Sequence, residues 1–448
     1  MNILGINGAI GWDGNLSTVW GNDYWVHGSG ATLFIDGELK GSLSEERLSR
    51  IKYDGRYAKS VIAQLLSRNN LTEDDIDIVA HVNNACMVSY ALKLQGYTTE
   101  QLSNLYPNAK IIMVDHHLAH ASGSFLSSGF MESNVFSFDA AGDHHPVLNT
   151  SDENMGTMSQ TVTRINNSGF YTGDYPSKHI TPIQHTFHDE SYNMFGEYYT
   201  EVSAYVYRLK TKGNTDNRSE DYRHGIENLK KMRSSCSLSS EIDMTDYTKN
   251  NDIMFFPPDT DIYFNHVKPV TPQERETYPG KIMGLAAYGD YTKVDLPDIF
   301  SIHISEDSMP VVIEDPNNGG RDWMFKNPYS PEDVAAWLQY QFEKYLLLYL
   351  KCIPKKIKTK NLCLSGGCAL NIIANTKILE EGIYEEVHVN TAPNDDGLNF
   401  GAAALLAWKN EKDLILPENM GCIGLEYNDN DIQKSFQKAG IENEVKDV

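Results

Sequence analysis

The sequence predicts an α/β protein built from two lobes. Short β-prone runs alternate with helical patterns, an early Asp-Gly pair signals a hairpin, and strand–turn–helix segments recur in the second half. The length of 448 residues suggests two or three domains. With 41% hydrophobic and 22% charged residues, the composition is that of an ordinary globular protein and excludes a disordered chain.

The elements of the first lobe follow from local patterns. Residues 2–7 predict a strand, and Asp36-Gly37 between two β-prone runs predicts a hairpin. A helix is expected over 56–68, because apolar residues recur there at helical spacing. A further strand is predicted over 76–82.

The second lobe is expected to begin after a buried strand at 111–114. A helix follows over 116–125, and the next strand starts at Val135. A long helix is predicted to start at Pro331, since proline is favoured in the first helical turn. Two strand–loop–helix segments then end the lobe.

These elements divide the chain into predicted domains. The first lobe covers 1–114 and the second covers 115–420. Residues 206–277 are polar and lack clear periodicity, so they are interpreted as an insertion within the second lobe. Residues 421–448 are interpreted as the start of a further domain that is missing from the chain.

Charge and cysteine usage narrow the class of protein. The net charge of −23 excludes a uniformly basic nucleic-acid coat. The sequence lacks both an apolar run long enough for a spanning helix and a signal-like start, so no membrane association is expected. The six cysteines are scattered without a CxxC pair, which favours reduced thiols in a cytoplasmic protein.

The sharpest chemical signal is a pair of histidines, His116 and His120. Four residues apart on a helix, they share one face and can bind one metal ion. A zinc metalloprotease would need glutamate at position 117, where this chain has histidine. Carboxylates are available at Asp139, after the next strand, and in the later Asp395-Asp396 loop, so an open divalent metal site is predicted; helix-start histidines that only pack or cap remain the alternative.

Two glycine-punctuated segments are candidates for nucleotide contacts. Ser365-Gly366-Gly367 lies between a strand and a helix, where backbone amides can approach a phosphate, although a plain tight turn remains open. The segment 278–289, YPGKIMGLAAYG, fits either close helix packing or the floor of a nucleotide site. Walker, GxGxxG and GxSxG motifs are absent from the sequence.

A basic cluster lies inside the predicted insertion. Between Arg208 and Arg233, eight lysines and arginines face four acidic residues, a local net charge of +4. A solvated surface explains this, and so does a docking patch for an anionic acceptor such as a nucleotide or DNA. The residues assigned to acceptor binding are Arg218, Arg223, Lys230, Lys231 and Arg233.

Taken together, the motifs resemble one family. In order they are LGINGAIGW, HGSGATLFIDGEL, SEERLSRIKYDGR, VDHHLAHASGSF, FSFDAAGD, YPGKIMGLAAYGD, LSGGCALN and NDDGLNFGAAALLAW. The chain resembles the O-carbamoyltransferases typified by the nodulation-factor, cephamycin and tobramycin enzymes. The resemblance runs from Asn2 to about Tyr427.

The resemblance implies a fold and a reaction. The fold would be of the actin/sugar-kinase/Hsp70 type, with two RNase-H-like lobes and a central cleft. Carbamoyl phosphate and ATP would give carbamoyl-adenylate and pyrophosphate, and the carbamoyl group would then pass to an acceptor hydroxyl with release of AMP. The acceptor would be a small molecule or a nucleotide, including a hydroxymethylpyrimidine, free or in DNA.

The resemblance also implies roles for individual residues. A divalent metal, expected to be Fe²⁺, would bind His116, His120, Asp139 and Asp395, with Asp396 as the alternative if the register slips by one. His27 and His117 are candidates for accepting the hydroxyl proton. The residues assigned to nucleotide binding are Ser365, Gly366, Gly367, Asn371, Lys281 and Gly284.

The sequence departs from the family in two places. The segment 206–277 is longer than expected, and a GPRALG-like continuation is missing after Gly440. The formation of carbamoyl-adenylate is therefore expected to require a separate adenylate-forming domain. A non-catalytic nucleotide-binding subunit that needs a partner chain is the alternative from another class.

Overall fold

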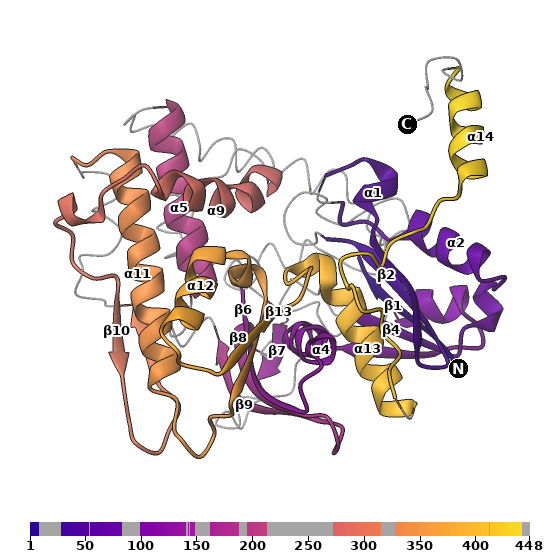
Figure 1. Cartoon of the computed structure of the whole chain (residues 1–448), viewed down its shortest axis with the longest axis horizontal. Helices are drawn as coiled ribbons and strands as arrows, with labels where there is room; N and C mark the ends of the chain where they lie inside the picture. Colours follow the sequence, from indigo (N-terminus) through magenta and orange to yellow (C-terminus); the bar gives the residue numbers. More distant parts are fainter. Residues whose placement is uncertain are drawn as a thin grey trace.

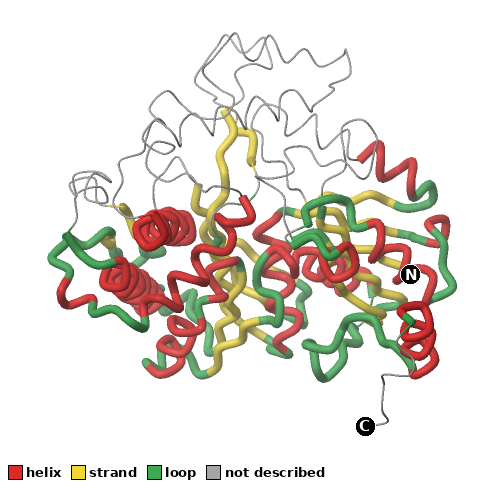
Figure 2. Tube along the Cα trace, turned by 90° about the horizontal axis from the view of Figure 1, so that it is seen from above, coloured by secondary structure: helices red, strands yellow, loops and turns green. Residues whose placement is uncertain are grey.

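The protein is an α/β structure with two main β-sheets, which confirms the predicted class (Figure 1). Helix α4 lies between the two sheets in Figure 1 and in the view from above in Figure 2. The computed structural model describes residues 1–8, 28–52, 54–82, 99–139, 142, 144–147, 162–187, 195–212, 272–314, 328–411 and 413–440.

The first sheet has five strands in the order β3-β2-β1-β4-β5. Strand β1 pairs antiparallel with β2 and parallel with β4. On the outer sides, β2 pairs antiparallel with β3, and β4 pairs parallel with β5. The strands are β1 Asn2–Asn7, β2 Gly30–Ile35, β3 Glu38–Ser44, β4 Ile78–Val82 and β5 Lys110–Val114.

The predicted hairpin is confirmed as β2–β3. Asp36 and Gly37 form its two-residue turn with φ angles of 50° and 81°. Both values lie in the left-handed region, which the tight hairpin turn requires and which Asp-Gly tolerates. Strands β1, β4 and β5 also lie where they are predicted, to within two residues.

Helix α2 Lys59–Arg68 begins three residues after the predicted start at Arg56. The buried Glu45 carboxylate explains this start, because it accepts the backbone N–H groups of Ser60 and Val61 at 3.1 and 3.0 Å. The predicted apolar face of α2 packs into the first core. Short helices α1 Glu46–Ser49 and η1 Glu73–Asp75 flank α2.

The second main sheet follows the order β13-β12-β6-β8-β7, with β9 paired to β8. Strand β6 pairs antiparallel with β8 and parallel with β12, so it repeats the arrangement around β1 in the first sheet. The strands are β6 Glu132–Phe138, β7 His144–Val147, β8 Val162–Asp174, β9 His179–Phe187, β12 Asn361–Ser365 and β13 Glu386–Val389.

Helices α5, α9 and α11 pack together beside the second sheet (Figure 1). Helix α11 starts at Pro331 as predicted, because the Ser330 hydroxyl accepts the Asp333 N–H at 3.1 Å. The elements are α5 Phe195–Lys212, α9 Pro272–Ala286, η5 Tyr291–Lys293, α11 Pro331–Lys351, η7 Gly367–Leu370, α12 Ile372–Glu380, and a small sheet of β10 Phe300–His303 and β11 Val311–Glu314.

The ends of the predicted insertion belong to helices. Residues 206–212 complete α5, and residues 272–277 begin α9, so both ends of the predicted insertion 206–277 are helical, and its limits stay a prediction. Residues 213–271 lie outside the described part of the chain. The YPGKIMGLAAYG segment forms the end of α9 and the turn after it. A Cβ built on Gly280 or Gly284 meets no atom of the described residues within 4 Å, so packing against the described helices does not explain these two glycines.

Helices α4 His116–Ser128 and α13 Leu398–Asn410 join the two sheets. Two glycines allow the close approach of these helices. A Cβ on Gly5 of β1 would lie 2.2 Å from the Asn399 backbone oxygen, and a Cβ on Gly401 of α13 would lie 1.9 Å from the Ala119 backbone oxygen, so neither position has room for a side chain. Although α13 lies within the predicted second lobe, it packs against strands of the first sheet. The boundary at 114/115 stays a prediction.

After α13 the chain runs along the free edge of the first sheet. The Leu39 N–H donates to the Ile415 carbonyl at 3.0 Å, and the Ser42 N–H donates to the Ile423 carbonyl at 2.8 Å. Helix α14 Asp429–Ala439 follows and has no buried residue. No helix among the described residues has both the length and the apolarity to cross a lipid bilayer.

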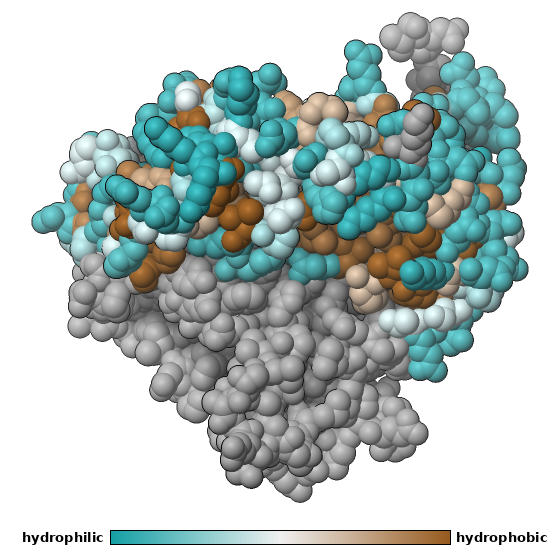
Figure 3. All heavy atoms as spheres, turned by 90° about the horizontal axis from the view of Figure 1, so that it is seen from below, coloured by the Kyte–Doolittle hydropathy of each residue, from teal (hydrophilic) through white to brown (hydrophobic). Residues whose placement is uncertain are grey.

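The described surface seen from below is mainly hydrophilic, with separate hydrophobic patches (Figure 3).

Candidate metal site

The two predicted histidines lie in the first turns of α4. The Asp115 side chain caps this helix by accepting the Leu118 N–H at 2.8 Å, which fixes the helix start at His116. His116 and His120 are therefore one turn apart on one face, with ring centroids 4.7 Å apart. Both rings are buried, with exposures of 4% and 3%.

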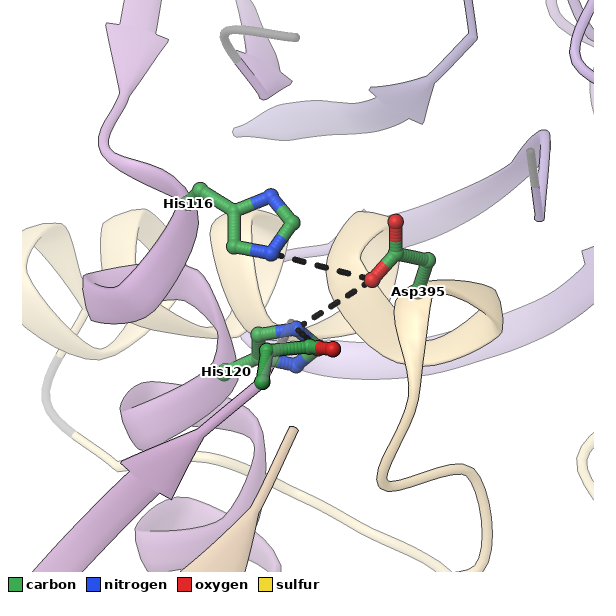
Figure 4. A group of neighbouring side chains, drawn as sticks. His116, His120 and Asp395 are labelled. Atoms are coloured by element: carbon green, nitrogen blue, oxygen red, sulfur yellow. Dashed lines mark ion pairs between the residues drawn. The ribbon is translucent and has the colours of Figure 1, made fainter. Parts of the chain in front are cut away.

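Two carboxylates approach these rings from other elements. Asp139 directly follows β6, and Asp395 begins η8 Asp395–Gly397, just before α13. The His120 Nε2 lies 3.3 Å from the Asp139 Oδ2 and 3.4 Å from the Asp395 Oδ1. The His116 Nε2 lies 3.7 Å from the same Asp395 oxygen (Figure 4).

These four side chains form a group suited to a metal ion. One ligand atom from each residue lies within 4.8 Å of all the others. Two imidazole nitrogens with two carboxylate oxygens suit a divalent transition metal, and the two carboxylates match its charge. Asp395 completes the group, whereas Asp396 accepts hydrogen bonds from Ser44 and Asn394 at 3.2 and 3.1 Å.

Burial and the neighbouring carboxylates move the pKa values of the two histidines in opposite directions. Burial lowers the pKa of His116, which keeps that ring neutral. Burial also opposes the charging of His120, but the hydrogen bonds and charges of Asp139 and Asp395 raise its pKa to about 9. A metal ion bound there would replace the proton on His120.

The glycine loop after β12 contacts the segments that carry both carboxylates. The Gly367 N–H donates to the Asp139 Oδ2 at 2.9 Å, and the Gly366 N–H donates to the Pro393 carbonyl at 2.7 Å, two residues before Asp395. Gly366 has φ +86°, and a Cβ on it would lie 2.3 Å from the Phe138 backbone oxygen. Position 366 therefore requires glycine for this loop conformation.

The first lobe reaches the same site through Asn7 at the end of β1. Its buried amide donates to the Gly28 carbonyl at 2.9 Å and to the Asp395 carbonyl at 3.1 Å. A Cβ on Gly28 would lie 2.8 Å from the backbone of Asp395 and Asp396. The Asp395 loop is therefore bonded both to β1 of the first sheet and, through Pro393, to the glycine loop after β12 of the second sheet.

The other predicted site residues have varied positions. His117 is fully buried, and its Nδ1 lies 2.8 Å from the Ser137 hydroxyl. Ser365 is fully buried at the end of β12, whereas Lys281 is exposed on α9 with its amine over the Tyr207 ring, 5.0 Å from the centroid. Outside the described residues lie His27, Arg218, Arg223, Lys230, Lys231 and Arg233.

Sequence patterns missed Asn7 and the backbone bond from Gly366 to Pro393. Asn7 is a polar residue that follows the apolar run 3–6 at the end of β1, and this position was the signal available for it as a residue of the site. The Gly366 bond joins residues distant in sequence through main-chain atoms, which no side-chain pattern reveals.

Comparison with known proteins gives a family match within the second half of the chain. The family model of the carbamoyltransferase N-terminus matches residues 319–404, which include the glycine loop and Asp395. Nodulation protein NolNO of Sinorhizobium fredii is 21% identical over 431 residues, covering 89% of this chain and 50% of that protein. Nodulation protein U of Rhizobium tropici is 48% identical over 77 residues, 16% of this chain and 13% of that protein.

The chain thus spans about half the length of NolNO. Among solved structures, full-length HypF in its phosphate- and nucleotide-bound form has a TM-score of 0.46 at 14% identity. That match covers 88% of this chain and 46% of HypF, and its score is too low to assign the fold.

Proposed function

We propose that this chain, which is related to carbamoyltransferases, transfers a carbamoyl group to the hydroxyl of an acceptor. The observation that carries the proposal is the group of His116, His120, Asp139 and Asp395. Asp395 lies inside the matched family segment, and Asp139 accepts a hydrogen bond from Gly367 of the same segment.

We assign Fe²⁺ to this group as the expected metal. A divalent ion there would supply positive charge for the oxygens of a carbamoyl–phosphate anhydride. The side chains contribute a neutral His116 and two carboxylates. The Asp139 carboxylate accepts the Gly367 N–H, and the Asn7 amide donates to the backbone carbonyl of Asp395. The burial of His116, His120 and Asp395 strengthens the electrostatic contacts of these residues.

The proposed donor is carbamoyl-adenylate, formed from carbamoyl phosphate and ATP by an adenylate-forming domain. In the transfer, the acceptor oxygen forms a bond to the carbamoyl carbon while the bond to the phosphate oxygen breaks and AMP leaves. His27 is the proposed acceptor of the hydroxyl proton. We prefer it to His117, because the buried His117 ring is hydrogen-bonded to Ser137.

The nucleotide is proposed to lie between the two sheets, against the loop 365–371 and α9. The amides of Gly366 and Gly367 already donate within the protein, so other groups of the loop must contact the nucleotide. Lys281 is exposed and offers a charge for a phosphate. The repeated strand arrangement around β1 and β6 supports the proposed two RNase-H-like lobes of the actin type.

The acceptor is proposed to be a small molecule or nucleotide with a free hydroxyl. The basic residues 218–233 favour an anionic acceptor, including hydroxymethylpyrimidine in DNA. Lys210 of the same basic cluster is paired with Glu332 on α11, so it is engaged within the protein.

The test is a transfer assay with three donor conditions. The chain receives carbamoyl-adenylate, or carbamoyl phosphate with ATP, or the latter with a separate adenylate-forming domain. Mass spectrometry detects the carbamoylated product for a neutral sugar and for a hydroxymethylpyrimidine oligonucleotide. We expect product with the first and third conditions.

Two outcomes would contradict parts of the proposal. Turnover of carbamoyl phosphate and ATP by the chain alone would refute its dependence on a second domain. If no acceptor is carbamoylated in any condition while nucleotide still binds, the chain is a non-catalytic nucleotide-binding subunit.

A further inference from the structure

A buried hydrogen-bond network lies at the end of the glycine loop, and it includes Asn371, which is also assigned to nucleotide binding. Its centre is a pair of side-chain amides, Gln339 on α11 and Asn371 at the start of α12. Both residues are almost fully buried, with exposures of 5% and 7%. Buried amides of this kind are costly unless their donors and acceptors are satisfied, so their partners define their role.

The two amides bind each other in both directions. The Gln339 Nε2 donates to the Asn371 Oδ1 at 3.0 Å, and the Asn371 Nδ2 donates to the Gln339 Oε1 at 2.9 Å. A two-point contact fixes both the position and the orientation of Asn371. The Asn371 Oδ1 also accepts the Ala374 N–H at 3.1 Å and thereby caps α12.

Gln339 in turn is held by two buried neighbours. The Tyr199 hydroxyl, from α5, donates to the Gln339 Oε1 at 2.7 Å. The Gln339 Nε2 also donates to the Glu343 Oε1 at 2.7 Å, and Lys377 of α12 pairs with the same carboxyl group. The network therefore joins α5, α11 and α12 at the point where the glycine loop ends.

The other end of this loop supports both metal carboxylates. Only four residues separate Gly366, bonded to the Pro393 carbonyl, from Asn371. Within the loop the Ala369 N–H donates to the Gly366 carbonyl at 3.0 Å, and the Asn371 N–H donates to the Cys368 carbonyl at 3.0 Å. Any displacement of Asn371 is thus passed to the amides that hold Asp139 and the Asp395 loop.

We propose that Gln339 is a positioning residue for the metal site. Through Asn371 it sets the place of the glycine loop, whose Gly367 amide holds the Asp139 carboxylate and whose Gly366 amide holds the backbone two residues before Asp395. Tyr199 makes α5 part of the same support. The part of this proposal that concerns the metal site rests on the proposed function. The part in which Gln339 holds the glycine loop in place does not depend on the proposed function.

The chain offers a matched control two residues away on the same helix. Gln341 is 1% exposed, its Nε2 donates to the Asp298 Oδ1 at 2.7 Å, and its Oε1 accepts the Ile299 N–H at 3.3 Å. It equals Gln339 in residue type, helix and burial, but its bonds lead to the segment before β10. Gln341→Met therefore measures the general cost of losing a buried amide from α11.

The experiment compares Gln339→Met and Gln341→Met by hydrogen exchange of the full chain without added metal. In Gln339→Met we expect exchange at Gly366 and Gly367 to accelerate by about tenfold, as expected for weakened hydrogen bonds. In Gln341→Met we expect faster exchange at Ile299, whereas the exchange rates of the loop amides should stay within about twofold of the wild type. Unchanged loop exchange in a folded Gln339→Met protein would overturn the proposal, and so would equal acceleration in both variants.

Tyr199→Phe is the second variant, because it removes one hydroxyl and keeps the ring. We expect a smaller acceleration of about threefold at the same loop amides. If Gln339→Met does not fold, the absence of any acceleration in Tyr199→Phe overturns the proposal.

Titration with Mn²⁺ then tests the link to the metal. Gln339→Met should bind Mn²⁺ about tenfold more weakly than the wild type, whereas Gln341→Met should bind it as well as the wild type. Mutation of residues that support metal ligands typically lowers metal affinity by about ten- to hundredfold. If the wild type binds no divalent ion, the proposed metal site is wrong, while the exchange result still decides the role of Gln339. Equal Mn²⁺ affinity in wild type and Gln339→Met would contradict the positioning of the carboxylates.

Discussion

At the scale of single residues, the metal ligands depend on partners that come from distant parts of the chain. The His120 Nε2 lies beside the carboxylates of Asp139 and Asp395. The Gly367 N–H donates to the Asp139 carboxylate, and the Asn7 amide donates to the backbone carbonyl of Asp395. If these side chains are metal ligands as proposed, such supports preorganise them, so that metal binding would not have to order them.

The first prediction concerns the metal content of a double variant. His116→Ala with His120→Ala removes both imidazoles, so bound iron should fall from about one equivalent to below roughly a tenth, because two carboxylates alone bind transition metals weakly. The measurement is elemental analysis of the purified proteins. His388→Ala is the control, since this half-buried histidine contacts Ser127 on the far part of α4. Equal metal content in the double variant and the wild type would refute the ligand assignment.

The second prediction concerns pH and stability at His81. Burial lowers the pKa of this histidine to about 4, and its Nε2 donates to the Gly8 carbonyl at 3.0 Å. Since the unfolded state takes up the proton at a higher pH, the contribution of His81 is complete above about pH 6.5 and is lost as the pH falls towards 4. Between about pH 7.5 and pH 5, the wild type should lose about 2 kcal/mol through this group.

Urea unfolding of wild type and His81→Gln at both pH values checks this prediction. The variant should be less stable at the higher pH and should lose about 2 kcal/mol less than the wild type on acidification. Parallel losses in the two proteins would show that His81 does not titrate in this range.

The residue patterns predict His116, His120 and Asp139 and leave Asp395 and Asp396 as alternatives, and the family resemblance selects Asp395. Neither predicts the residues that support these side chains. The spacing of His116 and His120 is a local property of a helix, and Asp139 and Asp395 end segments with clear strand and loop signals. Gln339 carries no such signal, because in the sequence it is one polar residue on a buried helix. Its importance arises from hydrogen bonds to residues 32 and 140 positions away.

At the scale of elements, the spacing between α4 and α13 decides whether the histidines meet Asp395. The helices approach each other closely because Gly401 faces the Ala119 carbonyl. A side chain at this point must move one helix away from the other. The distance from His120 to Asp395 is thus set by backbone contacts as well as by the ligands.

The third prediction follows from that contact. Gly401→Ala places a methyl group 1.9 Å from the Ala119 oxygen, so we expect a loss of about 1–3 kcal/mol in unfolding free energy together with weaker metal binding. Thermal unfolding and Mn²⁺ titration measure the two effects. Gly280→Ala on α9 is the matched control, because its added methyl meets no atom within 4 Å. Gly280→Ala should leave the unfolding free energy unchanged or increase it. If both variants change stability and metal binding alike, the close contact between Gly401 and Ala119 is unimportant.

Elements with caps and regular apolar spacing are predicted well, and the others are not. Pro331 and Ser330 fix the start of α11, and the Asp36-Gly37 turn fixes the β2–β3 hairpin. The start of α2 depends on the distant Glu45 carboxylate and is therefore predicted too early. The β8–β9 hairpin has no such local signal, because glycines and polar residues interrupt the alternation of β8.

At the scale of the whole molecule, the proposed nucleotide site joins elements on both sides of the region between the sheets. A ligand bound there should stabilise the folded chain. We predict that ATP or AMP raises the melting temperature, because a ligand at about 100 times its dissociation constant adds about 2.7 kcal/mol. A series of melting curves with ATP, AMP and GTP measures this.

Lys281→Ala is the companion variant, since its exposed amine is the proposed phosphate partner. It should reduce the shift produced by ATP more than the shift produced by AMP, which carries fewer phosphates. If millimolar ATP leaves the melting temperature of the wild type unchanged, the nucleotide site is wrong.

The place of α13 has a consequence for synthesis on the ribosome. Strands β1 to β3 emerge first, but the helix that covers β1 and the segment that pairs with β3 belong to residues 398–423. At about 5–20 residues per second, the nascent first sheet waits for about 20–80 seconds before its covering partner leaves the ribosome. During that interval the face of β1 that α13 covers is exposed, so the growing chain should depend on chaperones until residues 398–423 have been synthesised.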